Sequence, residues 1–266
     1  MTFRDDDLTW LEAHGVPALP AAIDTAEVET GGVRIRYAVF GGGAPVLLLH
    51  GGLGNMRNWA YQIPALVAAG YQAIAIDSRG HGKSTRDDQP FSYRLMAADT
   101  RAVMNRLGID KAAIIGWSDG ADTGLVMADE TPDRVCGLFF FACNVDNDGT
   151  LPFVLTPVVE RIFQQHQKDY AELSPAPDGF DALCEDLGPM QRTQPDYSAN
   201  DLKRIAAPVM VVLGEHDEFI RREHLEYLAA TLPNGRFVLL PEVSHFAPLQ
   251  RPDVFNQAML DFLRGL

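Results

Sequence analysis

The stretch AAIIGWSDG, residues 112–120, decides the fold. An uncharged apolar run leads into Gly116, and Ser118 follows between this glycine and Gly120. Helical periodicity begins at once, over residues 119–129. A serine on a sharp turn from strand to helix projects its hydroxyl outward, and the helix N-terminus favours developing negative charge. The motif predicts that Ser118 is a nucleophile; the alternative is an ordinary turn with Ser118 as helix N-cap.

The same order of strand and helix recurs along the chain from about residue 33. Short apolar runs alternate with longer helical segments, which is the pattern of a mainly parallel sheet covered by helices. Near-continuous apolar runs indicate strands buried on both faces. The sequence therefore predicts an α/β fold. We expect strands at 46–50, 72–77, 112–117, 135–142, 209–215 and 236–241, with 33–40 antiparallel at one edge, and helices at 57–69, 93–107, 119–129, 222–231 and 252–263.

The alternation of strands and helices breaks after residue 142. About 60 residues rich in Pro, Asp and Gln precede the next apolar strand, too many for an ordinary loop. We expect residues 144–205 to form a small helical cap over Ser118, inserted into a core of residues 26–143 and 206–266, with residues 1–25 as an N-terminal arm. The large apolar residues of the cap, either pocket wall or cap core, are Phe153, Phe163, Tyr170, Phe180 and Met190.

Composition limits the partners of the protein. Its 266 residues carry a formal charge of −14, which argues against nucleic acid. No stretch approaches the roughly 18 apolar residues that span a bilayer, and the acidic N-terminus is unlike a secretory signal. The three cysteines lack metal-ligand spacing. We expect a cytoplasmic protein that acts on a small-molecule substrate without a membrane partner; the oligomeric state is left open.

A nucleophilic serine needs a base, and His245 is the best placed of the seven histidines. It follows the last predicted strand, so its loop should lie at the same carboxyl edge of the sheet as Ser118. Asp217 follows the strand before it, which gives the chain order serine, acid, histidine. We expect Asp217 to orient the imidazole. The alternatives are Glu215 or Glu218 as the acid and His216 as the base.

A glycine-rich turn, HGGLGN at residues 50–55, follows an earlier strand. Backbone N–H groups on such a turn can point at an oxyanion, and the loss of one donor costs about 2.7 to 4 kcal/mol. We expect the amides of Leu53 and Asp119 to form this oxyanion hole. A phosphate-binding loop is the alternative, but the turn lacks the required glycine and lysine spacing. This chemistry needs no metal and no cofactor.

With these residues assembled, the sequence resembles the α/β-hydrolase family over nearly its whole length. The run DSRGHGKS, residues 77–84, is similar to a turn found in one branch of the family. That branch holds small esterases, lactonases, carbon–carbon hydrolases and cofactor-free haloperoxidases. We expect this turn to have a structural role in the present chain. Haloalkane dehalogenases and epoxide hydrolases of that branch carry an aspartate where this chain has Ser118. The resemblance therefore disfavours those two activities.

The elbow Gly-Trp-Ser-Asp-Gly resembles that of biphenyl-hydrolase-like members, which cleave α-amino-acid esters. The resemblance implies that Asp119 receives a substrate ammonium; the alternative is that its side chain caps the following helix. A carboxylate beside the nucleophile opposes the oxyanion unless a cation offsets it, which also indicates a cationic substrate. Gly52 and Trp117 are the other substrate contacts that we expect.

Together these features predict a serine hydrolase that cleaves a small-molecule carboxylic ester, with α-amino-acid esters among the candidates, through an acyl-enzyme on Ser118. The same residues would serve a carbon–carbon bond hydrolase, a lactonase, or a cofactor-free perhydrolase or acyltransferase. The alternative from another class is a ligand-binding protein that keeps the fold but has no turnover. Such a protein would lack a reactive serine.

Overall fold

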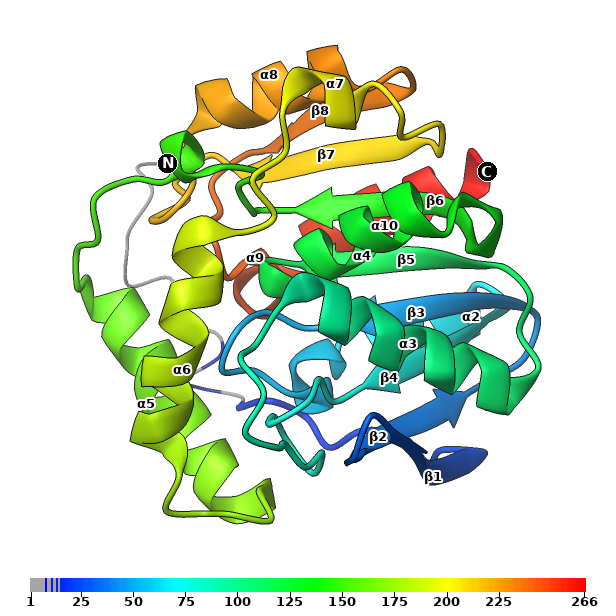
Figure 1. Ribbon diagram of the computed structural model, residues 1–266, viewed down its shortest axis with the longest axis vertical. Helices are drawn as coiled ribbons and strands as arrows, with labels where there is room; N and C mark the ends of the chain where they lie inside the picture. The colour runs from blue at the N-terminus through cyan, green and yellow to red at the C-terminus, as the bar shows by residue number, and fades with distance from the viewer. Residues whose placement is uncertain (1–7, 9–10, 12, 14) are drawn as a thin grey trace.

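The computed structural model describes residues 8, 11, 13 and 15–266, which are arranged around one eight-stranded sheet (Figure 1). The strands are β1 (Asp24–Thr30), β2 (Val33–Phe40), β3 (Ala44–Leu49), β4 (Tyr71–Ile76), β5 (Ala112–Trp117), β6 (Val135–Phe141), β7 (Val209–Gly214) and β8 (Gly235–Leu240). Their order across the sheet is β1-β2-β4-β3-β5-β6-β7-β8. All pairs from β4 to β8 are parallel. The α/β prediction is confirmed.

The edge of the sheet differs from the prediction. β2 is antiparallel to both neighbours, as expected, but β1 pairs along its whole length and takes the edge position. The sequence of β1, DTAEVET, leaves its side chains exposed or half-buried, so no apolar run reveals this strand. The expected arm, residues 1–25, overlaps the first two residues of β1. Much of its beginning (1–7, 9–10, 12 and 14) lies outside the described residues.

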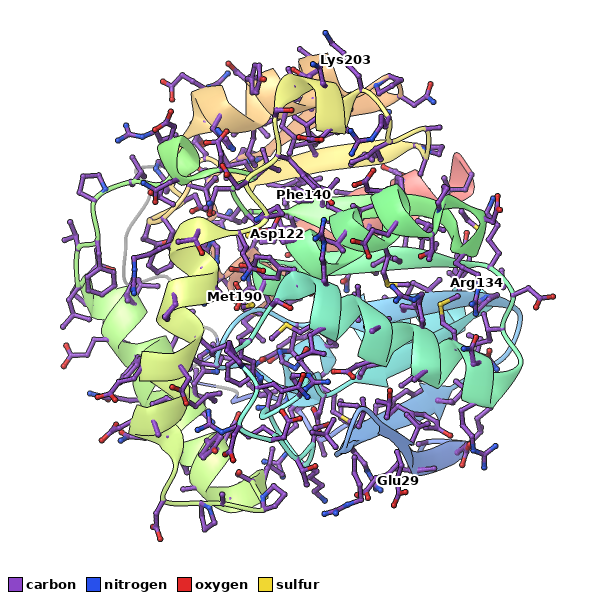
Figure 2. The ribbon with its side chains drawn as sticks, viewed as in Figure 1. Glu29, Asp122, Arg134, Phe140, Met190 and Lys203 are labelled. Carbon is purple, nitrogen blue, oxygen red and sulfur yellow. The ribbon has the colours of Figure 1, made fainter. Side chains whose placement is uncertain are left out.

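The central strands are buried on both faces. Every residue of β5 and β7 is buried, and Phe140 of β6 lies in the interior (Figure 2). The core helices are η1 (Met56–Trp59), α2 (Gln62–Ala68), α3 (Tyr93–Leu107), α4 (Asp119–Glu130), η2 (Pro132–Arg134), α8 (Arg222–Thr231), α9 (Ala247–Gln250) and α10 (Pro252–Arg264). Helices α3 and α4 pack together on one face of the sheet, and α2 and α10 on the other (Figure 1).

One predicted helix is split in two. The sequence predicts a helix over residues 57–69, whereas the chain forms the short η1 and then α2. The side chain of Asn55 caps η1 by accepting the N–H of Arg57 at 2.9 Å. Pro64 has no N–H to donate to a preceding turn. It is therefore tolerated in the first turn of α2, where no such donor is needed, but not inside one continuous helix.

Most of the segment predicted to form a cap, with its two long helices, lies beyond the carboxyl ends of the parallel strands (Figure 1). Its last short helix packs against α8 instead. The guanidinium of Arg57 donates to both carboxylate oxygens of Glu172, at 2.8 and 3.0 Å. Asn55 donates to Asp169 at 3.3 Å. These contacts tie the segment to the core; its standing as a separate domain stays a prediction. Its helices are η3 (Asn147–Gly149), α5 (Pro157–Leu173), α6 (Phe180–Thr193) and α7 (Ala199–Leu202).

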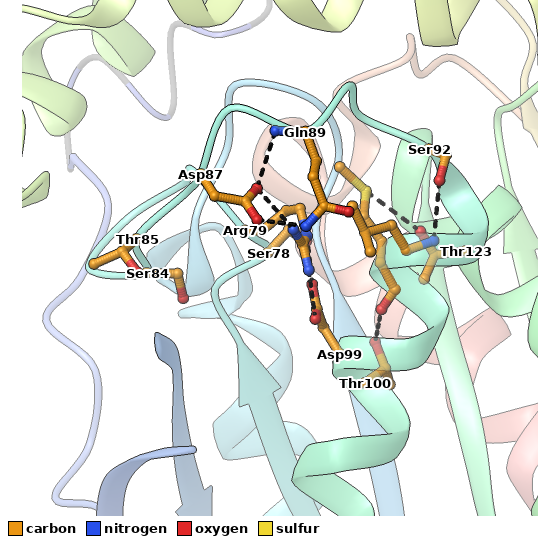
Figure 3. Close-up of polar contacts among 12 residues, drawn as sticks. Ser78, Arg79, Ser84, Thr85, Asp87, Gln89, Ser92, Asp99, Thr100 and Thr123 are labelled. Atoms are coloured by element: carbon orange, nitrogen blue, oxygen red, sulfur yellow. Dashed lines mark hydrogen bonds and ion pairs between the residues drawn. The ribbon is translucent and has the colours of Figure 1, made fainter. Parts of the chain in front are cut away.

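The turn after β4, residues 77–84, is fixed by buried polar contacts. Arg79 is buried and donates to both oxygens of Asp99 in α3, at 2.7 and 2.8 Å, and to Asp87 at 3.3 Å (Figure 3). The backbone N–H of Ser78 donates to Nε2 of His50 at 3.0 Å. This turn thus supports the glycine-rich loop that begins at His50, which fits the structural role expected for it.

Candidate active site

The turn between β5 and α4 holds Ser118 in an unusual backbone conformation. Its φ of 53° and ψ of −125° lie in a region that non-glycine residues rarely adopt, and such strain is typical of functional sites. A Cβ at Gly120 would overlap the carbonyl oxygen of Leu49, and one at Gly116 would meet the Cα of Ala121 at 2.5 Å. Among the described residues, Ser118 makes no side-chain capping bond, so the N-cap alternative is not supported.

The loops after β7 and β8 bring Asp217 and His245 together. His245 Nδ1 lies 3.0 Å from Oδ2 of Asp217 and 3.2 Å from Oδ1. The backbone N–H groups of Phe219 and Ile220 each donate to Oδ1 at 2.9 Å. An ionised carboxylate only accepts hydrogen bonds, so Asp217 favours the tautomer with the proton on Nδ1. Nε2 is then the atom left to accept a proton.

The competing residues occupy other positions. Glu218 accepts the backbone N–H of His245 at 3.0 Å. Glu215 is exposed and accepts the N–H of Glu242 at 3.0 Å. His216 lies 3.9 Å from the Glu215 carboxylate. Of the three acidic candidates, Asp217 is the one within hydrogen-bond distance of the imidazole of His245.

Burial and charge act in opposite directions on His245. Burial lowers the pKa of the imidazole, but the charge and hydrogen bond of Asp217, with the charges of Glu218 and Asp119, outweigh it. The pKa of His245 is therefore raised. Burial also raises the pKa of the Glu218 carboxyl to about 7. Because a raised pKa makes a stronger base, this setting favours the imidazolium that forms when a serine proton is taken.

The glycine-rich turn after β3 lies against the serine. Gly54 donates its N–H to the carbonyl of Gly51 at 3.1 Å, which closes a tight turn. Leu53 has a φ of 63°, in the left-handed region, at the position where such a turn requires positive φ. A Cβ at Gly51 would lie 3.1 Å from the Cβ of Ser118. The turn therefore brings Gly51, two residues before Leu53, close to the elbow.

Asp119 joins the core to the cap. Its buried carboxylate accepts from the hydroxyl of Tyr93 at 2.9 Å and from the amide of Gln191 in α6 at 3.0 Å. Burial raises the pKa of Asp119, although both hydrogen bonds and the charge of His245 oppose that rise. A Cβ at Gly52 would lie 2.6 Å from both Asp119 Oδ2 and Gln191 Nε2. The side chain is thus engaged by Tyr93 and Gln191.

One cavity of about 1080 Å³ connects most of these residues. Both Ser118 and His245 line it, whereas Asp217 lies behind the imidazole. Trp117, which is almost fully buried, contributes to the wall and has its ring 6.2 Å from that of His245. The predicted site residues on the wall are Gly52, Leu53, Trp117, Ser118, Asp119 and His245.

The roof of the cavity comes from the cap. Phe153 and Phe163, two of the five large apolar residues considered from sequence, line the cavity. Tyr170, Phe180 and Met190 are buried instead, and Met190 lies on α6 (Figure 2). The first two are therefore pocket wall, and the other three belong to the interior of the cap.

Sequence reasoning missed three residues at the site. Tyr93 and Gln191 bond to Asp119 from α3 and α6, and the ring of Phe219 meets that of His245 edge-on at 4.7 Å. All three are distant in sequence from the residues they contact, or lie in a loop without a motif. No local pattern points to them, because each contact joins parts of the chain that meet only in the folded protein.

Two other kinds of feature were sought in the part of the chain that the structure describes. No group of three or more His, Cys, Asp or Glu side chains there could hold a metal ion. The same residues include no helix that is long and apolar enough to cross a membrane.

Comparison with known proteins agrees with this geometry. The family model for the alpha/beta hydrolase fold matches residues 44–182, more than half of the chain. Serine hydrolase BPHL of Mus musculus is 28% identical, over 95% of this chain and 91% of that protein. The putative non-heme bromoperoxidase BpoC of Mycobacterium tuberculosis is also 28% identical, over 88% of this chain and 99% of that protein.

Solved structures share the same architecture. The meta-cleavage product hydrolase CumD of Pseudomonas fluorescens IP01 superposes with a TM-score of 0.76 at 21% identity, over 90% of this chain and 97% of that one. At that identity the likeness shows the fold. The sheet, the family match and the full-length similarity to a named hydrolase lead to one conclusion: the chain belongs to the alpha/beta hydrolase fold family and is an α/β-fold hydrolase.

Proposed function

We propose that the protein is a serine hydrolase that cleaves a small-molecule carboxylic ester through an acyl-enzyme on Ser118. The observation that carries the proposal is the 3.0 Å contact between His245 Nδ1 and Asp217, with His245 and Ser118 on the wall of one cavity. A carboxylate that holds Nδ1 leaves Nε2 for the serine proton. This is the division of labour that nucleophilic catalysis by serine requires.

The proposed reaction has two halves. In the first, Ser118 Oγ attacks the ester carbonyl carbon while His245 takes the hydroxyl proton, and the tetrahedral intermediate collapses with loss of the alcohol, which receives that proton. In the second, water attacks the acyl carbon, His245 takes a proton from the water, and this proton returns to Ser118 as the acid leaves. Asp217 stabilises the imidazolium in both halves.

The oxyanion formed in each half needs donors that are already in place. Asp119 is the first residue of α4, and the first N–H groups of a helix have no partner within it. The turn that contains Leu53 lies against Ser118 at Gly51. We therefore assign the amides of Leu53 and Asp119 as donors, and each contributes about 2.7 to 4 kcal/mol of transition-state stabilisation.

Asp119 extends the proposal to α-amino-acid esters. Its buried carboxylate lines the cavity, and the two side chains that donate to it, Tyr93 and Gln191, are neutral. A substrate ammonium would supply a positive charge beside it. In Asp119→Asn we expect kcat/KM for an aminoacyl ester to fall at least about tenfold more than for a neutral ester. Equal losses on both substrates would remove this part of the proposal.

The experiment compares wild type with Ser118→Ala on p-nitrophenyl acetate, a ring-fission diketone and a lactone, and with peroxide as acyl acceptor. The last three represent the other chemistries that the same residues would serve. We expect the highest kcat/KM on the ester, with kcat lower by about 10⁶-fold in the variant. Turnover of the diketone without turnover of esters would replace the proposal by carbon–carbon hydrolysis. No turnover of any substrate would favour a ligand-binding protein.

A further inference from the structure

A strap of irregular chain, residues 151–156, crosses the mouth of the cavity between η3 and α5. Leu151, Phe153 and Leu155 line the cavity, whereas the intervening Val154 does not. Phe153 is 70% exposed, Val154 61% and Leu155 60%. One side of the strap therefore faces the cavity while much of its apolar surface is open to solvent.

The strap is joined to the loop that carries Asp217. Leu151 donates its N–H to the carbonyl of Phe219 at 2.7 Å, and the ring of Phe153 stacks on that of Phe219 with centroids 6.4 Å apart. The ring of Phe219 in turn meets His245 edge-on at 4.7 Å. The cavity-lining side of the strap is thus on the side of the site where His245 lies.

The position of the strap beside His245 determines which part of a bound ester it would contact. His245 returns its proton to the departing alcohol oxygen, so the alcohol part of the ester leaves beside His245. Asp119, the residue proposed to receive a substrate ammonium, follows Ser118 directly at the start of α4. The exposed apolar side chains at the mouth would lose their contact with water if an apolar group covered them.

We propose that the strap, with Leu155 and Phe153 as its main contacts, binds an apolar alcohol group of the substrate, so that the preferred esters are those of long-chain or aromatic alcohols. The proposal rests on the ester hydrolase function and on continuity between the exposed strap and the cavity that holds Ser118. Phe163 of α5 is 40% exposed and lines the same cavity, which widens the apolar surface available to such a group.

Chain-length series test the proposal. Acetate esters of ethanol, butanol and octanol, each below its limit of solubility in water, are assayed by acid release, beside p-nitrophenyl acetate, butyrate and octanoate. We expect kcat/KM to rise about twofold per added methylene in the alcohol series, since a fully buried methylene gives about fourfold and the strap is partly exposed. The ratio of octyl to ethyl acetate is the readout, because it cancels any general loss of activity.

Leu155→Ser and Val154→Ser form a matched pair. The two side chains are adjacent and equally exposed, but only Leu155 lines the cavity. We expect Leu155→Ser to lower the octyl-to-ethyl ratio at least about fivefold. Val154→Ser should keep the wild-type ratio.

Several results would overturn the proposal. A flat alcohol series in wild type would do so while leaving ester hydrolysis intact. An equal fall of the octyl-to-ethyl ratio in Val154→Ser and Leu155→Ser would mean that the strap instead binds, as a surface, to a lipid aggregate or a second copy of the chain. If Leu155→Ser changed the chain-length dependence of the acyl series and not that of the alcohol series, the strap would bind the acyl group of the substrate. Absence of any ester turnover would instead refute the proposed function.

Discussion

The cavity has a floor, formed by loops of the core around Ser118, and a roof, formed by the cap. These two regions are held in place by different kinds of contact. On the floor, backbone geometry places the reactive groups: Ser118 sits at a φ of 53°, and glycines at 51 and 52 permit contacts that any Cβ would disturb. In the roof, side chains hold the cap to the core through pairs such as Arg57 with Glu172. The difference suggests a division in which the floor performs the chemistry and the roof selects the substrate. Substitutions in the two regions should then differ in size and kind.

The largest effect after removal of Ser118 itself is expected on the floor, at Asp217. Asp217→Asn keeps the shape of the side chain but favours the wrong tautomer of His245, and should lower kcat about 10⁴-fold. Glu218→Gln is the matched control, because Glu218 contacts the backbone N–H of His245 and not its ring. Steady-state kinetics on p-nitrophenyl acetate measure both. A loss in Glu218→Gln as large as that in Asp217→Asn would reassign the acid.

The pH dependence of kcat/KM tests the role of Asp217 on the floor in a second way. His245 must be neutral to take the serine proton, and its pKa is raised, since the charges of Asp217 and its neighbours outweigh burial. kcat/KM should therefore rise with pH through a midpoint above the ordinary histidine pKa, falling about tenfold per pH unit below it. In Asp217→Asn the main raising influence is lost and burial remains, so the residual activity should have a midpoint at lower pH. An unchanged midpoint would contradict this account of His245.

Gly52 lies where floor and roof meet. In Gly52→Ala the new methyl would lie 2.6 Å from Asp119 Oδ2 and Gln191 Nε2, so one of them must shift. We expect kcat/KM to fall about 10- to 100-fold, as small displacements of positioned groups can cost that much. Gly42→Ala is the control, because a Cβ there meets nothing within 4 Å. Similar kinetics in the two variants would show that the contact does not position Asp119.

The smallest effect is expected in the roof. Arg57→Ala removes the surface ion pair with Glu172 and a longer contact, at 3.9 Å, with the carboxylate of Asp169. Surface pairs contribute little, and Asp169 keeps its hydrogen bonds from Asn55 and Gln165. The melting temperature should fall by no more than about 3 °C. Differential scanning calorimetry gives this value. A much larger fall would show that the roof is held as firmly as the floor, which would break the contrast drawn above.

Much of the core could be predicted from sequence because its signals are local. The helices at 93–107 and 222–231 have the predicted ends, and the parallel strands lie within about two residues of theirs, since apolar runs and turn residues mark them. β1 was missed, because its exposed side chains give no such run. Pro64 marks the break in the helix predicted over 57–69, a signal that sequence reasoning passed over.

The residues of the candidate site also fall into those with a local sequence signal and those without one. Ser118, Asp217 and His245 follow strands, and their chain order brought them into one prediction; the structure places the last two in contact. Gln191 could not be found in this way, because it meets Asp119 only through the packing of α6 over the core. The same holds for Phe219 and the strap. Contacts made by folding of the cap leave no periodic mark in the sequence.

The central claim is that Ser118 is an activated nucleophile, and a fluorophosphonate probe tests it most directly. Wild-type protein and Ser118→Ala would be incubated with the probe, and the adduct located by intact-mass and peptide mass spectrometry. We predict one adduct per chain in wild type, located on Ser118, and none in the variant. An unlabelled wild type, or an adduct that persists in Ser118→Ala, would contradict the account.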